Sequence, residues 1–235
     1  MNRSLFVAFI TFFSAFAATL LTSACGNGKH HGAHKHSFKD VKKYEKMFES
    51  PERDARQKPE AVVRRMEIKA GMFIADIGAG TGYFARRFAR AAGKNGRVTA
   101  YDVEPAMTEH VNRAARRLGL SNLSAETIAA SRPKLPRRNF DIIFLCNTYH
   151  HIAERETYFR NLLNAVKLTG RLVIVDFKKD AGVERPPRRY RISREDAMNE
   201  LKRAGYECKA DTELLPDQYY LECRPRLMRR IDTRS

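Results

Sequence analysis

The chain has 235 residues, of which 43% are hydrophobic, enough for one domain of ordinary size with a proper core. Its formal net charge of +17 is expected to attract anionic partners, either phospholipid headgroups or nucleic acid. A solvated basic surface without a particular partner is an equally good interpretation. The four cysteines form no Cys-x-x-Cys pair, which argues against a structural zinc site.

The first 24 residues are expected to lie outside the folded domain. Arg3 precedes an uncharged run from Ser4 to Ala24 that is rich in Phe, Leu and Ala, which is typical of a signal peptide or a membrane anchor. The run ends in a sequence that resembles the lipobox of bacterial lipoproteins, Leu21-Thr22-Ser23-Ala24-Cys25-Gly26, although Thr22 stands where an aliphatic residue is usual. We favour the lipoprotein over an uncleaved anchor, for which about 20 apolar residues would suffice.

Either interpretation tethers the chain to a membrane. We therefore favour an anionic membrane surface over nucleic acid as the partner of the basic charge. The side of the membrane stays open, because a lipoprotein is exported. By contrast, lysines such as Lys29 and Lys35 closely follow the apolar run and only Arg3 precedes it, a distribution that the positive-inside rule places in the cytoplasm.

Residues 25–40 are expected to form a flexible tether, because they are rich in Gly, His and Lys and contain almost no apolar side chains. The tether carries a histidine cluster, made of His30, His31, His34 and His36. Such tracts can capture a divalent metal. Without Cys or carboxylate partners at fixed positions, however, we predict a plain linker and no metal site. The globular domain is expected to occupy residues 41–235.

Helices and strands alternate along this domain. Two leading helices are predicted, the first with apolar residues at Val41, Tyr44, Met47 and Phe48, the second opening at Pro59. The predicted strands are Met72–Ile77, Arg97–Asp102, Leu123–Ile128, Phe140–Cys146, Arg171–Phe177, Tyr206–Asp211 and Tyr219–Cys223. Apolar helix faces are predicted at Phe84/Phe88/Ala92, Met107/Val111/Ala114/Leu118 and Phe159/Leu162/Leu163/Val166. A last helix is expected to begin at Ser193, a capping residue, and to stop at Gly205.

This alternation predicts an α/β fold with a Rossmann-like sheet of seven strands, mostly parallel, and helices on both faces. The last two strands have no helix between them, so they predict an antiparallel hairpin at one edge. Cys208 and Cys223 lie in these strands at similar distances from a turn near Pro216. They can face each other and bond in an oxidising compartment, although the sequence alone does not fix the geometry. Cys146 falls in an apolar run and is expected to be buried.

A glycine-rich turn after the first predicted strand carries the chemistry. It reads Ala75-Asp76-Ile77-Gly78-Ala79-Gly80-Thr81-Gly82-Tyr83-Phe84-Ala85. The strand delivers Asp76, the glycines let the backbone bend and approach a ligand, and a helix then begins with free amide groups. The spacing is G-x-G-x-G, with Tyr83 where a pyrophosphate-binding G-x-G-x-x-G would have its third glycine. This spacing and the closing hairpin argue against an NAD-dependent oxidoreductase.

Asp102 ends the next predicted strand, twenty-two positions beyond Gly80. A carboxylate at this place can accept hydrogen bonds from both ribose hydroxyls of a nucleoside. Because the carboxyl ends of parallel strands meet at one edge of a sheet, we expect Asp76, the glycine turn and Asp102 to converge around an adenosyl group. A solvated acid at a strand end is the plainer alternative.

Three segments resemble the class I S-adenosylmethionine (SAM) methyltransferases. They are Asp76 through Phe84, Asp102 through Met107, and Asn139 through Asp141 before an apolar strand. The resemblance is to the small-molecule, type 11/25 branch, which contains ubiquinone/menaquinone-biosynthesis and arsenite methyltransferases, and it runs from about Tyr44 to Arg224. It implies that SAM is the cofactor, that Asp76 and the loop hold its methionine part, and that Asp102 holds the ribose.

One departure from this family concerns the adenine. The family often has an acid between the third and fourth strands, whereas this chain reads Ile128-Ala129-Ala130-Ser131, so backbone groups or Ser131 would hold the ring. The predicted cofactor-binding residues are Asp76, Gly78, Ala79, Gly80, Gly82, Tyr83, Asp102, Val103, Ser131 and Asn147.

The fourth predicted strand ends in Cys146-Asn147-Thr148-Tyr149-His150-His151, beside the reactive end of such a cofactor. Methyl transfer is an in-line displacement at a sulfonium carbon, so the protein mainly aligns the nucleophile and excludes water. A base is needed only if the nucleophile must lose a proton, and His150 or Tyr149 would then serve. Alternatively, one histidine points into the fold and the other contacts the cofactor. Tyr44 and Phe48 are interpreted as a lid over the site or as core.

We therefore expect a membrane-tethered, SAM-dependent methyltransferase that acts on a small-molecule or lipid-like acceptor. The reacting atom of the acceptor is not indicated, and no Cys cluster supports arsenic. An arginine-rich segment, residues 185–191, is interpreted as a contact for an anionic substrate or membrane, or as a solvated loop. A second hypothesis is an exported binding protein that retains the fold without turnover, because of the export signal and because Ala129-Ala130 stand where an acid is usual.

Overall fold

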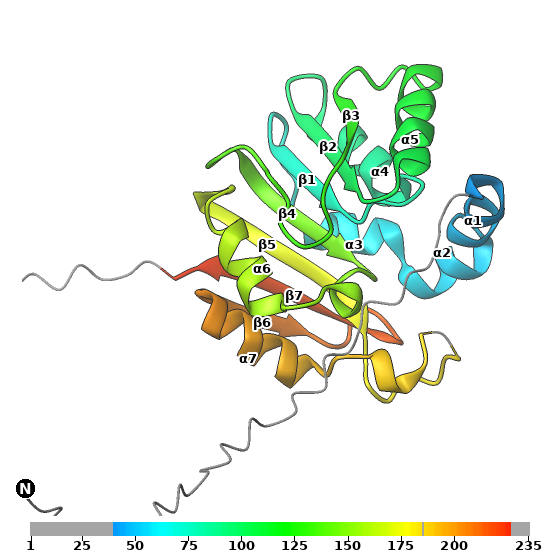
Figure 1. Cartoon of the computed structure of the whole chain (residues 1–235). Coiled ribbons are helices and arrows are strands. Elements are labelled where there is room, and N and C mark those ends of the chain that lie inside the picture. Colours follow the sequence, from blue (N-terminus) through cyan, green and yellow to red (C-terminus); the bar gives the residue numbers. More distant parts are fainter. Residues whose placement is uncertain (1–39, 185, 227–235) are drawn as a thin grey trace, which may run out of the picture. The chain divides into compact units, whose positions relative to one another are not determined.

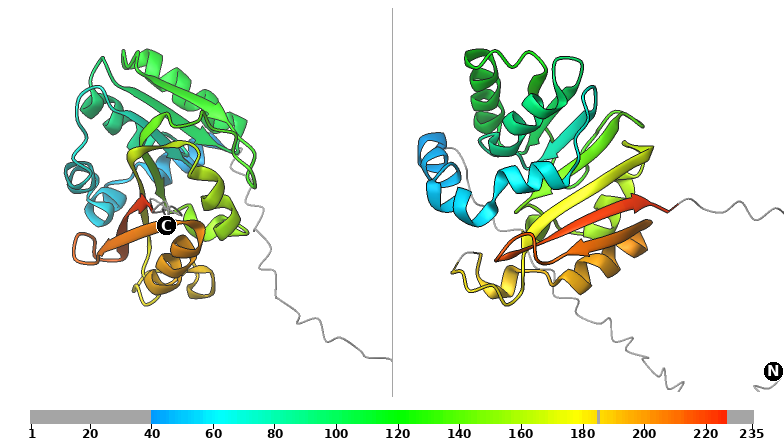
Figure 2. Two further views of the ribbon diagram at one scale, coloured as in Figure 1. Left: turned by 90° about the vertical axis from the view of Figure 1, so that its left-hand side faces the viewer. Right: turned by 180° about the vertical axis from the view of Figure 1, so that it is seen from behind.

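The computed structural model describes residues 40–184 and 186–226. The expected signal or anchor segment, the histidine cluster and nearly all of the tether lie outside the described residues. Within the described ranges, the structure contains no helix that is long and apolar enough to cross a membrane. These ranges form a central sheet with helices packed against both of its faces (Figures 1 and 2).

The sheet has seven strands in the order β3-β2-β1-β4-β5-β7-β6. Neighbouring strands from β3 to β5 are parallel, whereas β7 runs antiparallel to both β5 and β6. The strands are β1 Phe73–Ile77, β2 Arg97–Asp102, β3 Leu123–Thr127, β4 Phe140–Cys146, β5 Val166–Phe177, β6 Tyr206–Asp211 and β7 Gln218–Pro225. The predicted fold, a mostly parallel sheet closed by an antiparallel hairpin, is confirmed.

Seven α-helices surround the described sheet. They are α1 Val41–Phe48, α2 Pro51–Gln57, α3 Pro59–Arg65, α4 Tyr83–Ala92, α5 Pro105–Arg117, α6 Arg155–Leu162 and α7 Arg194–Ala204. Residues of α3, α4 and α5 share one buried cluster with the sheet, and residues of α6 and α7 share a second cluster on the other face. The two faces can be followed in Figure 2, where the green and cyan helices lie opposite the orange one.

Local sequence explains where these helices begin and end. The hydroxyl of Ser193 accepts a hydrogen bond from the Asp196 amide, and Gly205 closes α7 in the left-handed conformation, as predicted. The helix α2 was not predicted, because its sequence is polar and Gln57 is its only buried residue; Ser50 caps it and Pro51 opens it. Val166, which was assigned to a helix face, instead begins β5.

The closing hairpin contains a disulfide. Cys208 lies directly opposite Cys223 in the β6–β7 register, and the structure joins the two sulfurs. Their α-carbons are 4.0 Å apart and 15 positions separate them in the sequence. The structure thus joins the two cysteines whose pairing the sequence left open. Cys146 is free and buried, as expected.

The fold brings several chain segments to the carboxyl edge of the parallel strands. The turn after β1, the end of β2 at Asp102 and the end of β4 at Cys146 lie there, because these strands run parallel and in close register. Gln218 joins them, since the antiparallel β7 begins opposite the last residue of β5. The helices α1 and α2 extend over this edge, as their contacts below show.

Candidate active site

The turn after β1 bends through three glycines. Gly78, Gly80 and Gly82 have φ angles of 72°, 54° and 79°, a region that residues other than glycine rarely adopt. The amides of Gly78 and Ala79 both donate to the carbonyl of Tyr101, at 2.7 and 3.1 Å. A β-carbon on Gly78 would collide with the side chain of Thr148. The turn therefore requires glycine for both its backbone angle and its close packing on the β4 end.

Comparing Gly71 with Gly78 makes it possible to measure the effect of the backbone angle separately from the effect of close packing. Gly71 has a φ of 86° but open space around its missing β-carbon, whereas Gly78 combines a φ of 72° with the collision. We expect Gly71→Ala to lower the free energy of unfolding by roughly 1 kcal/mol for its backbone angle alone. Gly78→Ala should lose roughly 1–3 kcal/mol more because Thr148 must move. Urea unfolding of both variants measures the difference, and equal losses would contradict the steric account.

Asp102 links the end of β2 to the glycine turn. One carboxylate oxygen accepts a hydrogen bond from the Gly80 amide at 2.8 Å, and the other accepts one from the Glu104 amide at 3.0 Å. The side chain is buried, and this burial raises the pKa of Asp102 although the backbone hydrogen bonds oppose the shift. The structure thus brings the carboxylate and the glycine turn together, as the sequence predicts. The role of Asp102 toward a ribose stays a prediction.

Asp76 is a buried carboxylate directly below the turn. Only 2% of the residue is exposed, and its Oδ2 atom has no hydrogen-bond partner. Burial raises the pKa of Asp76 to about 7, with a further increase from the Asp102 charge; Arg53 and the Ala85 amide oppose the rise. A buried acceptor that lacks a partner is costly in a ligand-free protein. Its position therefore suits a ligand that brings a positive charge to the turn.

The remaining predicted cofactor residues lie at different places around this edge. Val103 is exposed directly after Asp102. Ser131 is exposed in the loop after β3, a loop whose first residue, Ile128, donates to the Asp102 carbonyl at 2.9 Å. Tyr83 begins α4 but turns toward α2, where its hydroxyl donates to Asp54. The structure thus places Val103 next to Asp102 and Ser131 in a loop that begins beside it, and it directs the Tyr83 hydroxyl toward α2.

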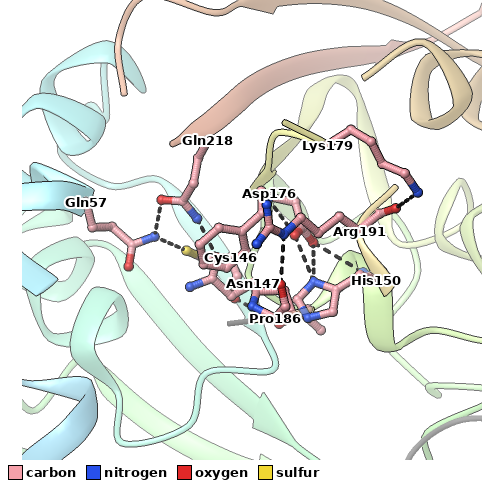
Figure 3. A network of polar contacts seen from close by, with 11 residues as sticks. Gln57, Cys146, Asn147, His150, Asp176, Lys179, Pro186, Arg191 and Gln218 are labelled. Carbon is pink, nitrogen blue, oxygen red and sulfur yellow. Dashed lines mark hydrogen bonds and ion pairs between the residues drawn. The ribbon is translucent and has the colours of Figure 1, made fainter. Parts of the chain in front are cut away.

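A network of amides and a thiol covers the ends of β4 and β7 (Figure 3). The Gln57 amide nitrogen donates to the Cys146 sulfur at 2.8 Å and to the Gln218 side-chain oxygen at 2.9 Å. Gln218 in turn donates to the side-chain oxygen of Asn147, a residue with a φ of 55°. Burial raises the pKa of the Cys146 thiol to about 12, which keeps it protonated at neutral pH. Gln57 and Gln218 were not predicted, and no sequence spacing marks them.

His150 and Asp176 form a buried pair beside this network (Figure 3). The imidazole Nδ1 lies 2.8 and 3.0 Å from the two carboxylate oxygens of Asp176, and the His150 amide donates to the same carboxylate at 3.2 Å. The side chains are 3% and 1% exposed. This contact fixes the orientation of the imidazole and leaves Nε2 as the ring nitrogen that is not bonded to Asp176. Of the two histidines, His150 is therefore buried, whereas His151 is exposed.

Tyr149, the other base considered, is placed differently. Its ring is fully buried and stacks on Phe159, and its hydroxyl donates to the Glu200 carboxylate at 2.5 Å. Burial raises the pKa of Tyr149 above its usual range, and the Glu200 charge adds to this. The structure does not bring the Tyr149 hydroxyl together with the glycine turn, because the side chain turns into the core formed with α6 and α7.

The helix α1 supplies an aromatic cover for the turn. Two atoms of the Phe48 ring would lie 3.4 Å from a β-carbon on Gly80, and the Tyr44 ring packs 5.4 Å from that of Phe48. The predicted cover by these two residues is thus seen for Phe48. An apolar ring at this place limits water access to the turn.

The comparisons with known proteins agree with this geometry. Residues 74–170 match the family described as a methyltransferase domain. A Salmonella arizonae ubiquinone/menaquinone biosynthesis C-methyltransferase is 26% identical over 113 residues, which cover 48% of this chain and 45% of that protein. The chain thus aligns with about half the length of the curated relatives that it matches.

Solved structures extend the similarity to most of the described domain. A SAM-dependent methyltransferase from Aquifex aeolicus has a TM-score of 0.73 and 25% identity, covering 80% of this chain and 98% of that one. The [4+2]-cyclase SpnF has the same fold, with a TM-score of 0.62 and 21% identity over 73% of this chain and 81% of that one. The fold is that of the SAM-dependent methyltransferases, and residues 74–170, less than half of the chain, match a methyltransferase domain. This fold implies SAM as the cofactor.

The residues present fit this cofactor. SAM carries a positively charged amino group in its methionine part, and the unpartnered Oδ2 of Asp76 offers a buried acceptor for it. The glycines of the turn leave room where side chains would collide, and Asp102 supplies a carboxylate at the β2 end. The residues that would hold SAM are therefore Asp76, the glycine turn and Asp102, with Phe48 as cover.

Proposed function

We propose that this domain transfers the methyl group of SAM to a small-molecule or lipid-like acceptor. The proposal rests on one observation above all: a buried, unpartnered Asp76 carboxylate lies below a glycine turn that Asp102 joins at 2.8 Å. The family match makes methyl transfer the first reaction to test. The fold alone is insufficient, because a [4+2]-cyclase shares it.

When bound, SAM supplies a sulfonium carbon that is already activated toward a nucleophile. The chain has to hold the cofactor, align the acceptor and exclude water. For an acceptor that must lose a proton, His150 is the group we assign: Asp176 holds its Nδ1 at 2.8 Å, so the Nε2 can accept the proton as the new bond to carbon forms. Asp176 then stabilises the imidazolium cation.

This assignment predicts a selective loss of turnover. His150→Asn should lower kcat by roughly 100-fold or more while SAM affinity changes little. Asp176→Asn should retain the ring but alter its tautomer, and so lower kcat. His151→Asn, whose ring lies 4.1 Å from that of His150, tests whether loss of ring packing alone lowers kcat. Unchanged kcat in His150→Asn would show that the acceptor needs no base there.

The acceptor entrance is inferred from the surface beside the amide network. An open hollow of about 570 Å³ is lined by Arg56, Gly182, Val183, Glu184 and Asp217. Arg56 and Asp217 pair at 2.9 Å and directly adjoin Gln57 and Gln218 in the sequence. These amides offer neutral donors and acceptors, which suit a polar, uncharged group on the acceptor. The quinone-related function named for the Salmonella relative supports a ring-containing, lipid-like acceptor as the first class to screen.

The experiment that tests the function uses the full chain. Equilibrium dialysis with labelled SAM measures cofactor binding, and incubation with a cell extract and methyl-labelled SAM followed by mass spectrometry detects a product that is heavier by one methyl group. Binding together with a labelled product supports the proposal. Absence of SAM binding by the folded protein would remove its basis.

Membrane attachment is a separate proposal. It rests on the lipobox-like N-terminal sequence and the net charge of +17, and on the disulfide of the hairpin, since such bonds persist mainly in oxidising compartments. Sedimentation with anionic and with neutral vesicles tests the attraction to lipid. A reporter fused to the C-terminus tests the side of the membrane, with the exported side expected from the disulfide.

The exported binding protein without turnover remains the second candidate, because the disulfide favours a compartment in which SAM is not made. It differs from the first in one measurable respect. A protein that binds an adenosyl ligand but yields no methylated product in any extract fits this candidate. A single labelled product excludes it.

A further inference from the structure

Arg53 is a cation that α2 places beside the glycine turn. Its guanidinium carbon lies 4.0 Å from the centre of the Tyr83 ring and 5.6 Å from that of Phe48. The Nε donates to Gln57 at 2.7 Å, and Nη1 donates to the Phe48 carbonyl at 2.8 Å. Stacking and hydrogen bonding thus hold the planar group in one orientation.

These contacts use only part of what a guanidinium offers. The two hydrogen bonds engage two of its five N–H groups, and the guanidinium also contacts the Cys146 thiol. Its positive charge reaches the site, because Arg53 is the cation that most opposes the raised pKa of Asp76 and also acts on the Cys146 thiol. Yet Oδ2 of Asp76 has no hydrogen-bond partner. The charges of Arg53 and Asp76 therefore attract each other, but no hydrogen bond joins the guanidinium to Oδ2 of Asp76.

A fixed cation beside the glycine turn and a buried anion below it match one kind of ligand group. An α-amino acid carries an ammonium and a carboxylate on the same carbon, and each needs a partner of opposite charge when it leaves water. We infer that Arg53 and Asp76 form a subsite for an amino-acid zwitterion, with the guanidinium binding the carboxylate of the cofactor's methionine part. The inference rests on the proposed cofactor and adds Arg53, which no sequence motif marks.

The subsite makes a prediction about ligand selection. S-adenosylhomocysteine carries the complete amino-acid group, whereas 5′-methylthioadenosine has the same nucleoside and sulfur without it. Arg53→Gln should weaken S-adenosylhomocysteine binding by roughly 10- to 100-fold, the range expected for loss of a charge-assisted hydrogen-bond pair. Binding of 5′-methylthioadenosine should change less than about twofold, because the nucleoside contacts remain.

Isothermal titration of the full chain with both ligands measures this, and two further variants make it decisive. Arg53→Lys retains the charge without the planar fork, so its loss of S-adenosylhomocysteine affinity should be intermediate. Arg64→Gln removes an exposed arginine from α3 and should change neither affinity. Retained binding of 5′-methylthioadenosine also shows that Arg53→Gln is folded; if that variant does not fold, the Arg53→Lys comparison carries the test.

The outcomes separate the inference from the proposed function. If Arg53→Gln weakens both ligands by the same factor, or neither, the zwitterion subsite is wrong while the adenosyl site stands. If the wild-type protein binds neither ligand, the proposed function fails and the subsite fails with it. A loss confined to the ligand with the amino-acid group supports both.

Discussion

Replacing Asp76 with Asn is expected to weaken SAM binding strongly and, at the same time, to stabilise the ligand-free protein above neutral pH. Asp76 is 2% exposed, and its Oδ2 has no partner. The side chain is thus suited to a cationic ligand and unfavourable without one. Because Asn has the same shape but no charge, it should lose the attraction to the ammonium group, weakening SAM binding by roughly 100-fold or more.

The sign of the stability effect follows from the pKa of Asp76. Burial and the Asp102 charge raise this pKa from 3.8 to about 7 in the folded state. Between these two values the folded state binds more protons than the unfolded state, so the free energy of unfolding falls as the pH rises. At about 1.4 kcal/mol per pKa unit, the loss is on the order of 4 kcal/mol once the pH exceeds the folded value. Asp76→Asn removes this loss.

Urea unfolding at pH 5 and pH 8 checks the prediction. Asp76→Asn should be more stable than the wild type by roughly 2 kcal/mol at pH 5 and by roughly 4 kcal/mol at pH 8, whereas Asp180→Asn, an exposed control, should show no such change. SAM affinity of the wild type should also fall about tenfold per pH unit below 7, since the ligand requires the ionised carboxylate. A stability difference that is the same at both pH values would contradict the raised pKa.

The sequence was sufficient for the parts of the site that depend on backbone geometry. A run of three glycines directly after a predicted strand fixes a turn, and an acid at the end of the next parallel strand must lie at the same edge of the sheet. The 2.8 Å contact between Asp102 and the Gly80 amide confirms that reasoning. The closing hairpin was predictable for a similar reason, because two strands joined by a short turn leave no room for a crossover helix.

The contributions of polar side chains could not be predicted in this way. The helix α2 lacks an apolar face, so hydrophobic periodicity does not reveal it, yet it carries Arg53 and Gln57. Asp176 lies 26 positions from His150, and only the parallel pairing of β4 with β5 brings the two together. In the short turn after β4, Tyr149 and His150 point to different surroundings. Neighbours in the sequence therefore differ in role although both are titratable.

Val166 shows the opposite limit, where periodicity was misleading. Its spacing from Leu162 and Leu163 fits a helix face, but the residue pairs with Phe140 and begins β5. A register shift then follows between Phe140 and Ile142. An irregular strand start of this kind leaves no alternating pattern in the sequence, so a buried valine at helical spacing is ambiguous.

The second large effect is expected from the disulfide between Cys208 and Cys223. The bond closes a segment of 15 positions at the edge of the sheet. Linking two residues at this separation restricts the unfolded chain and so raises its free energy by about 3 kcal/mol at 25 °C. The oxidised protein should therefore have a higher free energy of unfolding than the variant Cys208→Ala/Cys223→Ala by roughly 2–4 kcal/mol.

Urea unfolding with and without dithiothreitol separates the bond from the side chains. The reductant should destabilise the wild type to nearly the level of the double variant, and it should leave the double variant unchanged, because Cys146 is free and buried. Equal stability of the oxidised and reduced wild type would contradict the effect. Because the hairpin supplies Gln218 at the start of β7, loosening its edge should also raise the KM for the acceptor. Binding of SAM should be less affected, since Asp76 and Asp102 lie on β1 and β2. In an exported protein, this disulfide would thus contribute more to binding of the acceptor than to binding of SAM.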